Sequence, residues 1–353
     1  MSASDSGAVS TTTKADDFLH LLGQIQRYSV NTSHPNFFNQ LFGAMDPVAL
    51  AAEVLALSLN TSAYTFETAP VFTLIEREVM HRLGRLVFEG KDEVEDDDED
   101  GIVSPKYDGL MVPGGSLSNL TALHIARHHW LVTNGYDPPI RTRQEDLFDE
   151  DDAKSTAGEE AKDNEEKKDE DACFSIAGFK DVAFPAMADQ SRVPPRMVAL
   201  VSDEAHYSFR KAMAVTGIGA SNLIAVRTLK NGQMDPAALD EAIRGAKARG
   251  LVPFFVAVTS GSTVRGSFDD IDAVVRVCRQ HETIDATTGR RHSIWVHVDG
   301  AWGGSVIFSR RPDMTTLLAG VQRADSFTFN PHKMLGAPNQ TTAFITRHRG
   351  LLR

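Results

Sequence analysis

The chain has 353 residues, of which 42% are apolar and 24% are charged. This balance is ordinary for a globular protein, and the length suits one large domain or two ordinary ones. Two cysteines, Cys173 and Cys278, are too few for a disulfide framework or a four-cysteine zinc site, and they favour a reducing, cytoplasmic compartment. No apolar run is long enough to span a membrane, and the first residues lack the basic-then-apolar order of a secretory signal.

The net charge of −12 is concentrated in two acidic blocks. Residues 91–100 carry −7 and residues 144–171 carry −10, so the rest of the chain carries +5. Because runs of like charge are usually solvated, we interpret these blocks as surface insertions, at about 91–108 and 138–190, in a domain that spans 69–353. The small basic excess elsewhere gives no basis for nucleic-acid binding, and we expect no metal site because no ligand spacing appears.

The first 68 residues are predicted to form a tail and a helical segment. Residues 1–16, rich in Ser, Thr, Ala and Asp, are expected to be a disordered tail. Helices are expected within the segment 17–68. Apolar residues at helical spacing predict the first over 17–30 and the second over 46–60, where Asp46 is placed to cap the N-terminus.

A third helix and a glycine-rich turn follow. Residues 70–88 start with a proline and carry one apolar stripe, which predicts a helix. After the first acidic block, the turn at 113–119 (PGGSLSN) precedes a helical pattern over 120–132. A turn of small and hydroxyl residues at a helix N-terminus suits the binding of phosphate, because the first backbone N–H groups of a helix lack partners.

Beyond residue 195, short apolar runs alternate with helical patterns. Two helices are predicted, over 236–249 and 271–280. Short buried strands that alternate with helices indicate an α/β fold, with a mostly parallel sheet and helices on both faces. The six runs are Met197–Val201, Leu223–Val226, Phe254–Val258, Ile294–Val298, Ser326–Phe329 and Ala343–Ile345.

Polar side chains follow these runs where ligands gather in such sheets, at the carboxyl ends of the strands. His206 follows the first run and Thr259 the third. Asp299 follows the fourth run, and His332 and Lys333 follow the fifth. A lysine amine, a carboxylate and an aromatic ring suit a phosphorylated aromatic aldehyde, which forms a Schiff base with lysine and needs its pyridine nitrogen held protonated.

Five motifs carry a family resemblance: His34–Leu41, Asn60–Phe72, Pro113–Asn119, His297–Gly304 and Asn330–Lys333. As a set they resemble the pyridoxal-phosphate-dependent group II amino-acid decarboxylases, nearest to the cysteine sulfinate and glutamate decarboxylase branch. The resemblance runs from about residue 34 to the end of the chain, interrupted by the acidic blocks. It implies the large domain of a fold-type I transferase, with the family's C-terminal small domain missing, and a homodimer formed through the N-terminal segment.

The resemblance also implies roles for individual residues. Lys333, Asp299 and His206 are expected to be catalytic: Lys333 forms the Schiff base, Asp299 pairs with the pyridine nitrogen, and His206 stacks on the ring. Ala301 is expected on the opposite ring face and Thr259 near the ring hydroxyl. The phosphate ligands implied are Ser116, Leu117 through its backbone N–H, Ser118, Asn330 and His332.

The implied reaction is decarboxylation of a small acidic L-amino acid, namely cysteine sulfinate, aspartate or glutamate. Gln40 matches a position that contacts the side-chain acid of the substrate in this branch. Phe42 resembles the residue of the cysteine sulfinate decarboxylases more than that of the glutamate decarboxylases. The alternatives are a catalytically impaired pyridoxal-phosphate-binding homologue or dimerisation partner, and another fold-type I reaction. These stay open, because the family's catalytic-loop tyrosine is expected beyond residue 353.

Overall fold

The computed structural model describes residues 11–38, 41–90, 106–136, 194–286 and 288–352. The acidic residues at 91–100 and 144–171, and with them most of both predicted insertions, lie outside these ranges, as does Gln40. Within the described ranges, no helix is both long enough and apolar enough to cross a membrane.

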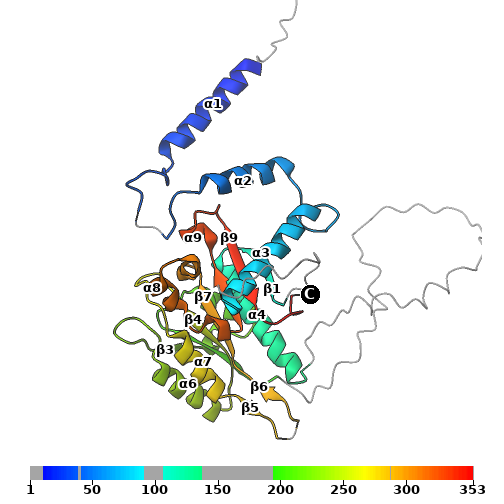
Figure 1. The fold of residues 1–353 in the computed structure, drawn as a ribbon, viewed down its shortest axis with the longest axis vertical. Coiled ribbons are helices and arrows are strands. Elements are labelled where there is room, and N and C mark those ends of the chain that lie inside the picture. The colour runs from blue at the N-terminus through cyan, green and yellow to red at the C-terminus, as the bar shows by residue number, and fades with distance from the viewer. Residues whose placement is uncertain (1–10, 39–40, 91–105, 137–193, 287, 353) are drawn as a thin grey trace, which may run out of the picture.

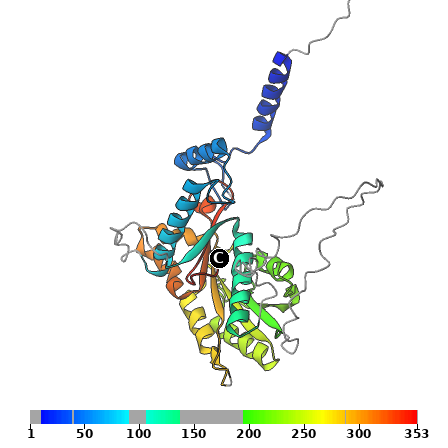
Figure 2. The same cartoon turned by 90° about the vertical axis from the view of Figure 1, so that its right-hand side faces the viewer.

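Three helices precede the sheet: α1 (Thr11–Tyr28), α2 (Pro47–Leu59) and α3 (Pro70–Phe88). Asp46 caps α2 as predicted, since its carboxylate accepts the backbone N–H groups of Val48 (2.9 Å) and Ala49 (3.2 Å). Helix α1 starts at Thr11, so residues 11–16 are helical and were wrongly assigned to a disordered tail. No glycine or proline interrupts this stretch, and helix therefore propagates through it. Helix α1 extends away from the sheet (Figures 1 and 2).

A seven-stranded sheet with the order β1-β9-β8-β7-β4-β2-β3 forms the centre of the molecule (Figure 1). The five strands from β8 to β3 pair in parallel, whereas β9 is antiparallel to both β8 and β1. The strands are β1 (Asp108–Pro113), β2 (Met197–Ser202), β3 (Leu223–Val226), β4 (Val252–Thr259), β7 (Trp295–Gly300), β8 (Ser326–Phe329) and β9 (Thr341–Thr346), and a separate two-stranded ribbon joins β5 (Thr283–Ile284) to β6 (Arg291–His292).

Helices cover both faces of this sheet, and each face has its own apolar core. Alternate residues of β4 point to opposite faces: Val256 and Val258 pack in the core beneath α3, α6 and α7, whereas Phe255 and Ala257 pack beneath α4 and α5. The remaining helical elements are α4 (Gly115–Thr133), α5 (Ser208–Val215), η3 (Ala220–Asn222), α6 (Pro236–Ala248), α7 (Ile271–Gln280), η4 (Gly303–Phe308), α8 (Pro312–Thr315), η5 (Thr316–Leu318), η6 (Val321–Arg323) and α9 (Pro331–Met334).

This architecture confirms the predicted α/β class with a mostly parallel sheet and helices on both faces. All six apolar runs are strands, and the helices predicted over 236–249 and 271–280 are α6 and α7. Strand β1 was not predicted. It begins at Asp108, at the end of the first acidic insertion, and Gly109 gives it little β propensity; its pairing with β9 supplies what the local sequence lacks.

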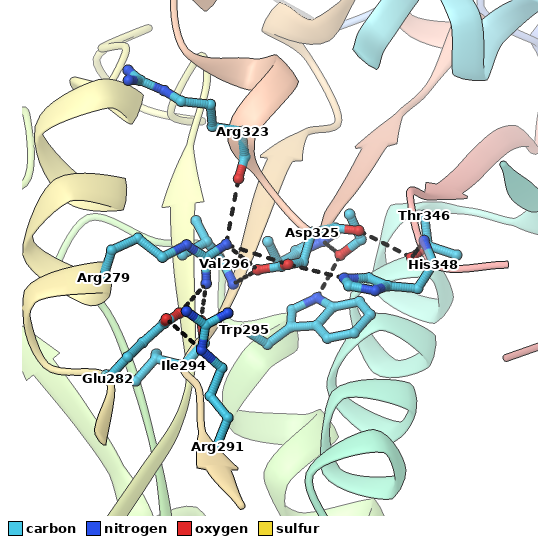
Figure 3. Close-up of polar contacts among 12 residues, drawn as sticks. Arg279, Glu282, Arg291, Ile294, Trp295, Val296, Arg323, Asp325, Thr346 and His348 are labelled. Atoms are coloured by element: carbon cyan, nitrogen blue, oxygen red, sulfur yellow. Dashed lines mark hydrogen bonds and ion pairs between the residues drawn. The ribbon is translucent and has the colours of Figure 1, made fainter. Parts of the chain in front are cut away.

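A polar network surrounds Asp325 at the edge of the sheet where β7 and β8 begin (Figure 3). The buried Asp325 carboxylate accepts hydrogen bonds from the Val296 N–H (2.8 Å) and from His348 Nε2 (2.9 Å). Arg279 forms an ion pair with it at 3.2 Å and a second one with Glu282 at 2.6 Å. Burial alone would raise the pKa of Asp325, but His348 and Arg279 hold it below its usual value. Each end of this carboxylate therefore has partners within the protein.

Candidate active site

A cavity of about 220 Å³ opens at the opposite edge of the sheet, beyond the carboxyl ends of β2, β4, β7 and β8. The N-terminus of α4 closes its other side. This is the edge at which ligands bind in parallel sheets. The cavity is lined by Gly115, Ser116, Asn119, His206, Tyr207, Thr259, Gly261, Thr263, Asp299, Ala301, Trp302, Asn330, His332 and Lys333.

Lys333 lies in the short helix α9, directly after β8, and is half-buried in the cavity wall. Burial lowers the pKa of its ammonium group, and the charge of Asp299 opposes that effect. A depressed pKa favours the neutral amine, which is the form that attacks an aldehyde. Lys333 is therefore suited to form a Schiff base in this cavity.

Asp299 is the penultimate residue of β7 and is buried, with 5% of its surface exposed. Its Oδ1 accepts the N–H of Ala301 (3.1 Å) and its Oδ2 accepts the side-chain amide of Asn119 (2.7 Å). Among the ion pairs of the described residues, none involves Asp299. A buried carboxylate without an ion-pair partner is costly, and a protonated nitrogen in the cavity would compensate its charge.

The N-terminus of α4 forms the other end of the cavity. Gly114 precedes the helix with a φ of +94°, a conformation that side chains disfavour. A Cβ on Gly115 would lie 3.2 Å from the Cβ of Ala301 and 3.1 Å from the amide of Asn330, so the absence of a side chain keeps this end open. Ser116 lines the same end. The first backbone N–H groups of a long helix such as α4 lack partners within the helix, so this end of the cavity suits an anion.

Two buried oxygens in the cavity wall, Thr259 Oγ1 and Asn330 Oδ1, have no hydrogen-bond partner among the described residues. Buried polar atoms are normally paired, so such atoms in a cavity wall mark a position where a ligand completes the bonding. They come from the ends of two different strands, β4 and β8. The cavity thus offers hydrogen-bonding groups beside both the acid and the amine.

His206 follows β2 and is half-buried in the cavity wall. Its ring lies 4.2 Å from the ring of Tyr207, and its Nδ1 accepts the N–H of Ser208 at 3.3 Å. Burial lowers the pKa of His206, against the opposing charge of Asp299. The imidazole is therefore neutral at neutral pH and presents a flat, uncharged ring beside the cavity.

The structure brings most of the predicted site residues together. Eight of them line one cavity: Ser116, His206, Thr259, Asp299, Ala301, Asn330, His332 and Lys333.

Three other predicted residues lie elsewhere. The Leu117 N–H, predicted to bind phosphate, donates to Gly114 O at 3.1 Å. Ser118 is fully buried and its hydroxyl pairs with Thr328 (2.5 Å). Phe42 packs near Phe37, with ring centroids 5.8 Å apart, and is outside the cavity wall.

Sequence reasoning missed four polar or aromatic residues of the cavity wall: Asn119, Tyr207, Thr263 and Trp302. Three of them adjoin or belong to a residue or motif that had been singled out, and Thr263 lies four positions after Thr259. Asn119 ends the glycine-rich turn, and Tyr207 and Trp302 directly follow His206 and Ala301. Adjacency was the available signal, but it does not tell which neighbours face the cavity.

Residues 5–139 and 177–353 match the family described as the pyridoxal-dependent decarboxylase conserved domain. The chain belongs to this family. Human cysteine sulfinic acid decarboxylase is 36% identical over 319 residues, which cover 90% of this chain and 48% of the human protein. The acidic amino acid decarboxylase GADL1 of Xenopus tropicalis is 34% identical over 339 residues, or 96% of this chain and 51% of the relative. The chain thus spans about half the length of the curated relatives it matches.

Comparison of the fold with solved structures points to the same family. The crystal structure of mouse CSAD superposes with a TM-score of 0.69 at 33% identity, covering 100% of this chain and 57% of the mouse chain. Family membership confirms the resemblance read from the five motifs, the fold-type I class and pyridoxal phosphate as the family's cofactor. The residues present fit that cofactor, because an amine with a depressed pKa, an uncompensated carboxylate and two unpaired oxygens share one cavity.

Proposed function

We propose that the protein is a pyridoxal-phosphate-dependent carboxy-lyase that converts a small acidic L-amino acid, cysteine sulfinate, aspartate or glutamate, to the amine and CO2. One observation carries the proposal: Lys333 and Asp299 line the same cavity in a chain of the decarboxylase family. The curated relatives support the substrate class, since one is named a cysteine sulfinic acid decarboxylase and another an acidic amino acid decarboxylase.

Two residues would hold the reactive part of the cofactor. Lys333 would hold the aldehyde carbon through its amine, whose depressed pKa favours the nucleophilic form. Asp299 would hold the ring nitrogen protonated, since its buried carboxylate forms no ion pair with the described residues. When bound, pyridoxal phosphate acts as an electron sink for the carbanion left by loss of CO2.

The other wall residues would orient the cofactor. Ser116, Asn330 and His332 line the cavity and would hold the phosphate beside the N-terminus of α4. His332 donates from Nδ1 to Thr341 O at 2.5 Å, which fixes its ring. His206 and Ala301 would pack on the ring faces, and Thr259 would pair with the ring hydroxyl. Leu117, whose N–H donates to Gly114 O, and Ser118, whose hydroxyl pairs with Thr328, would support this end through the first turn of α4 rather than by direct contact with the phosphate.

Substrate selection is proposed to involve Gln40 and Phe42, which lie on the segment before α2. Asp46, four residues after Phe42, lies close to α9, because its N–H donates to Gly336 O (2.8 Å) just beyond that helix. Replacing Phe42 by Ala is expected to change the relative rates for cysteine sulfinate and glutamate while cofactor binding stays unchanged. Equal rate changes for both substrates would count against this role.

The test of the proposed function has two stages. Apoprotein is first titrated with pyridoxal 5′-phosphate, and the visible absorbance band is followed in the wild type, in Lys333→Ala, and in Lys230→Ala as a control at an exposed lysine. We expect the band in the wild type and the control and its loss in Lys333→Ala. CO2 release from cysteine sulfinate, aspartate and glutamate is then measured. Binding without release from any of the three would support the catalytically impaired homologue instead, and no binding would overturn the proposal.

We also propose a homodimer that buries the N-terminal helices. Along α1 the side chains of Phe18, Leu19, Leu21, Leu22 and Ile25 are 44–64% exposed. In α2 no residue is buried. Exposed apolar surface of this extent is typical of an interface.

Light scattering after size exclusion tests the assembly. Leu57→Asp, at a position 70% exposed on α2, is expected to shift the protein toward monomer. Val215→Asp, at a 73% exposed position on α5, serves as the control and should leave the mass unchanged. A monomeric wild type at micromolar concentration would contradict the proposal.

A cytoplasmic location completes the proposal. Its support is the cysteine content, with Cys278 free and fully buried, because unpaired thiols are typical of reducing compartments. Fractionation of cells that express the protein tests it, and recovery in a secreted or organellar fraction would contradict it.

A further inference from the structure

A chain of buried polar side chains runs from Asp299 into the sheet, away from the cavity. Asn119 contacts Asp299, His297 contacts Asn119, and Ser326 contacts His297 in turn. Trp295 ends the chain by contacting Ser326. The two distances nearest Asp299 are 2.7 Å for Asn119 Nδ2 to Asp299 Oδ2 and 3.1 Å for His297 Nε2 to Asn119 Oδ1.

The chemistry of these groups fixes the direction of every hydrogen bond. The indole of Trp295 can only donate, so Ser326 Oγ accepts from it at 2.8 Å. A carboxylate can only accept, so Asn119 presents its NH2 group to Asp299 and its carbonyl oxygen to His297. His297 Nε2 must then carry the proton.

The neutral state of His297 completes this assignment. Burial lowers the pKa of His297 to about 4, against the opposing charge of Asp299. The ring is therefore neutral at pH 7, and because Nε2 is protonated, Nδ1 accepts the Ser326 hydroxyl proton at 2.8 Å. All four bonds point the same way, toward the carboxylate of Asp299.

Burial gives the chain little freedom to rearrange. Asn119 is 1% exposed, His297 and Ser326 are 0% exposed, and Trp295 is 4% exposed. Flipping the Asn119 amide would set its oxygen against the Asp299 carboxylate and its NH2 group against the His297 N–H. Unpaired or opposed polar atoms in such a place are costly, so the orientation is enforced.

We propose that Asn119 and His297 are positioning residues, which orient the Asp299 carboxylate toward the pyridine nitrogen of the cofactor. An amide donor stabilises the anion without neutralising it, whereas an arginine in the same place would compete with the ring nitrogen. The inference rests on the proposed function, because it requires pyridoxal phosphate in the cavity. It also accounts for Ser118, whose partner Thr328 lies 3.4 Å from His297 Nε2 and so belongs to this chain rather than to the cavity wall.

The first experiment removes the amide. Asn119→Ala, Asp299→Asn and the double variant are titrated with pyridoxal 5′-phosphate, and the pH at which the visible band of the loaded protein changes is recorded. Loss of a hydrogen bond to a charged group is expected to weaken cofactor affinity about tenfold to a hundredfold. The pH profile of Asn119→Ala should shift in the same direction as that of Asp299→Asn. In the Asp299→Asn background, Asn119→Ala should add nothing further, because the two residues act as one unit.

Ser208→Ala is the matched control. The Ser208 hydroxyl accepts the other N–H of the same amide at 3.0 Å and is outside the chain to Asp299. Its removal should leave the pH profile of the wild type in place. A wild-type profile and affinity in Asn119→Ala, or an effect that adds in full to that of Asp299→Asn, would overturn the inference.

A second variant covers the case in which Asn119→Ala does not fold. Ser326→Ala removes a link that does not touch Asn119 and frees Nδ1 of His297. It is expected to give a smaller shift of the pH profile in the same direction, and an unchanged profile there would overturn the inference. Should the wild type bind no pyridoxal 5′-phosphate, the proposed function itself fails; binding by the wild type with unshifted variants refutes only the positioning role.

Discussion

Two buried aspartates lie at opposite edges of the same pair of strands. Asp299 is the penultimate residue of β7 and is 5% exposed, and Asp325 directly precedes β8 and is 6% exposed. Asp325 has an arginine, a histidine and a backbone N–H as partners, whereas Asp299 has an amide and a backbone N–H. With equal burial, the carboxylate at one edge of the sheet is ion-paired, and the carboxylate at the other edge forms no ion pair with the described residues.

This difference separates stability from function within one sheet. A neutralised carboxylate joins elements of the fold, as Asp325 joins α7 to the segment after β9 through Arg279 and His348 (Figure 3). An uncompensated one is retained at a cost that a ligand can offset. The unpaired oxygens of Thr259 and Asn330 lie in the same cavity as Asp299, which places the incomplete bonding at the proposed active site.

The largest expected effect is on stability at the Asp325 edge. Asp325→Ala leaves the Arg279 charge, the Val296 N–H and His348 without their common partner. Removing the buried carboxylate of this partly buried ion pair is expected to lower the free energy of unfolding by about 3 kcal/mol. Urea unfolding followed by circular dichroism measures the change. A loss below about 1 kcal/mol would show that the network is not structural.

The two edges should also respond to acid in different pH ranges. His297 has a folded-state pKa of about 4 against an ordinary value of 6.5, so the unfolded state binds the proton first as pH falls. Stability from this group is present above pH 6.5 and is lost toward pH 4, by about 3 kcal/mol in total. The pKa of Asp325 is lowered from 3.8, so the stability that this carboxylate contributes is lost as pH falls below 3.8.

His297→Phe separates these ranges. The difference in unfolding free energy between the wild type and this variant is expected to shrink as pH falls from 7 to 4, whereas Asp325→Ala keeps the wild-type slope in that range. Equal slopes for the wild type and His297→Phe would contradict the assignment.

A smaller effect on stability is expected at the cavity edge. Asp299→Asn removes a buried charge that no cation of the described residues neutralises, so the apoprotein should unfold within about 1 kcal/mol of the wild type. Cofactor binding should nevertheless weaken strongly in the same variant. Thermal unfolding of the apoprotein and titration with pyridoxal 5′-phosphate measure the two effects. A loss of stability as large as that of Asp325→Ala would erase the contrast between the edges.

The smallest effect is expected at the rim of the Asp325 network. Arg291 is 69% exposed and pairs with Glu282 at 3.3 Å. Exposed ion pairs contribute little, so Arg291→Ala should cost less than about 1 kcal/mol. Urea unfolding measures this change as well. A loss of unfolding free energy near that of Asp325→Ala would mean that the exposed Arg291–Glu282 pair contributes as much stability as the buried carboxylate.

The sequence predicted the elements and the edge at which the site lies, because both follow from local patterns. Continuous apolar runs indicated buried parallel strands, and the residues after those runs had to meet at one edge. Asp299 and Lys333 were placed together by this rule. Strand β1 escaped prediction because its partner β9 lies more than two hundred residues away along the chain.

What could not be predicted is how side chains pair across long separations. Asn119 and Asp299 are 180 positions apart, and nothing local shows that one donates to the other. Ser118 and Ser116 look alike in the sequence, yet the helical turn points one toward Thr328 in the interior and the other to the cavity. The Asp325 network likewise joins residues from distant segments, and only the folded chain brings them together.

The central claim is that Lys333 holds the cofactor. Reduction of protein loaded with pyridoxal 5′-phosphate by borohydride, followed by digestion and peptide mass analysis, tests it most directly. We expect the added mass on the peptide that contains Lys333 and its absence from Lys333→Ala. Added mass at another lysine, such as Lys211 beside Tyr207, or no stable addition at all, would contradict the account.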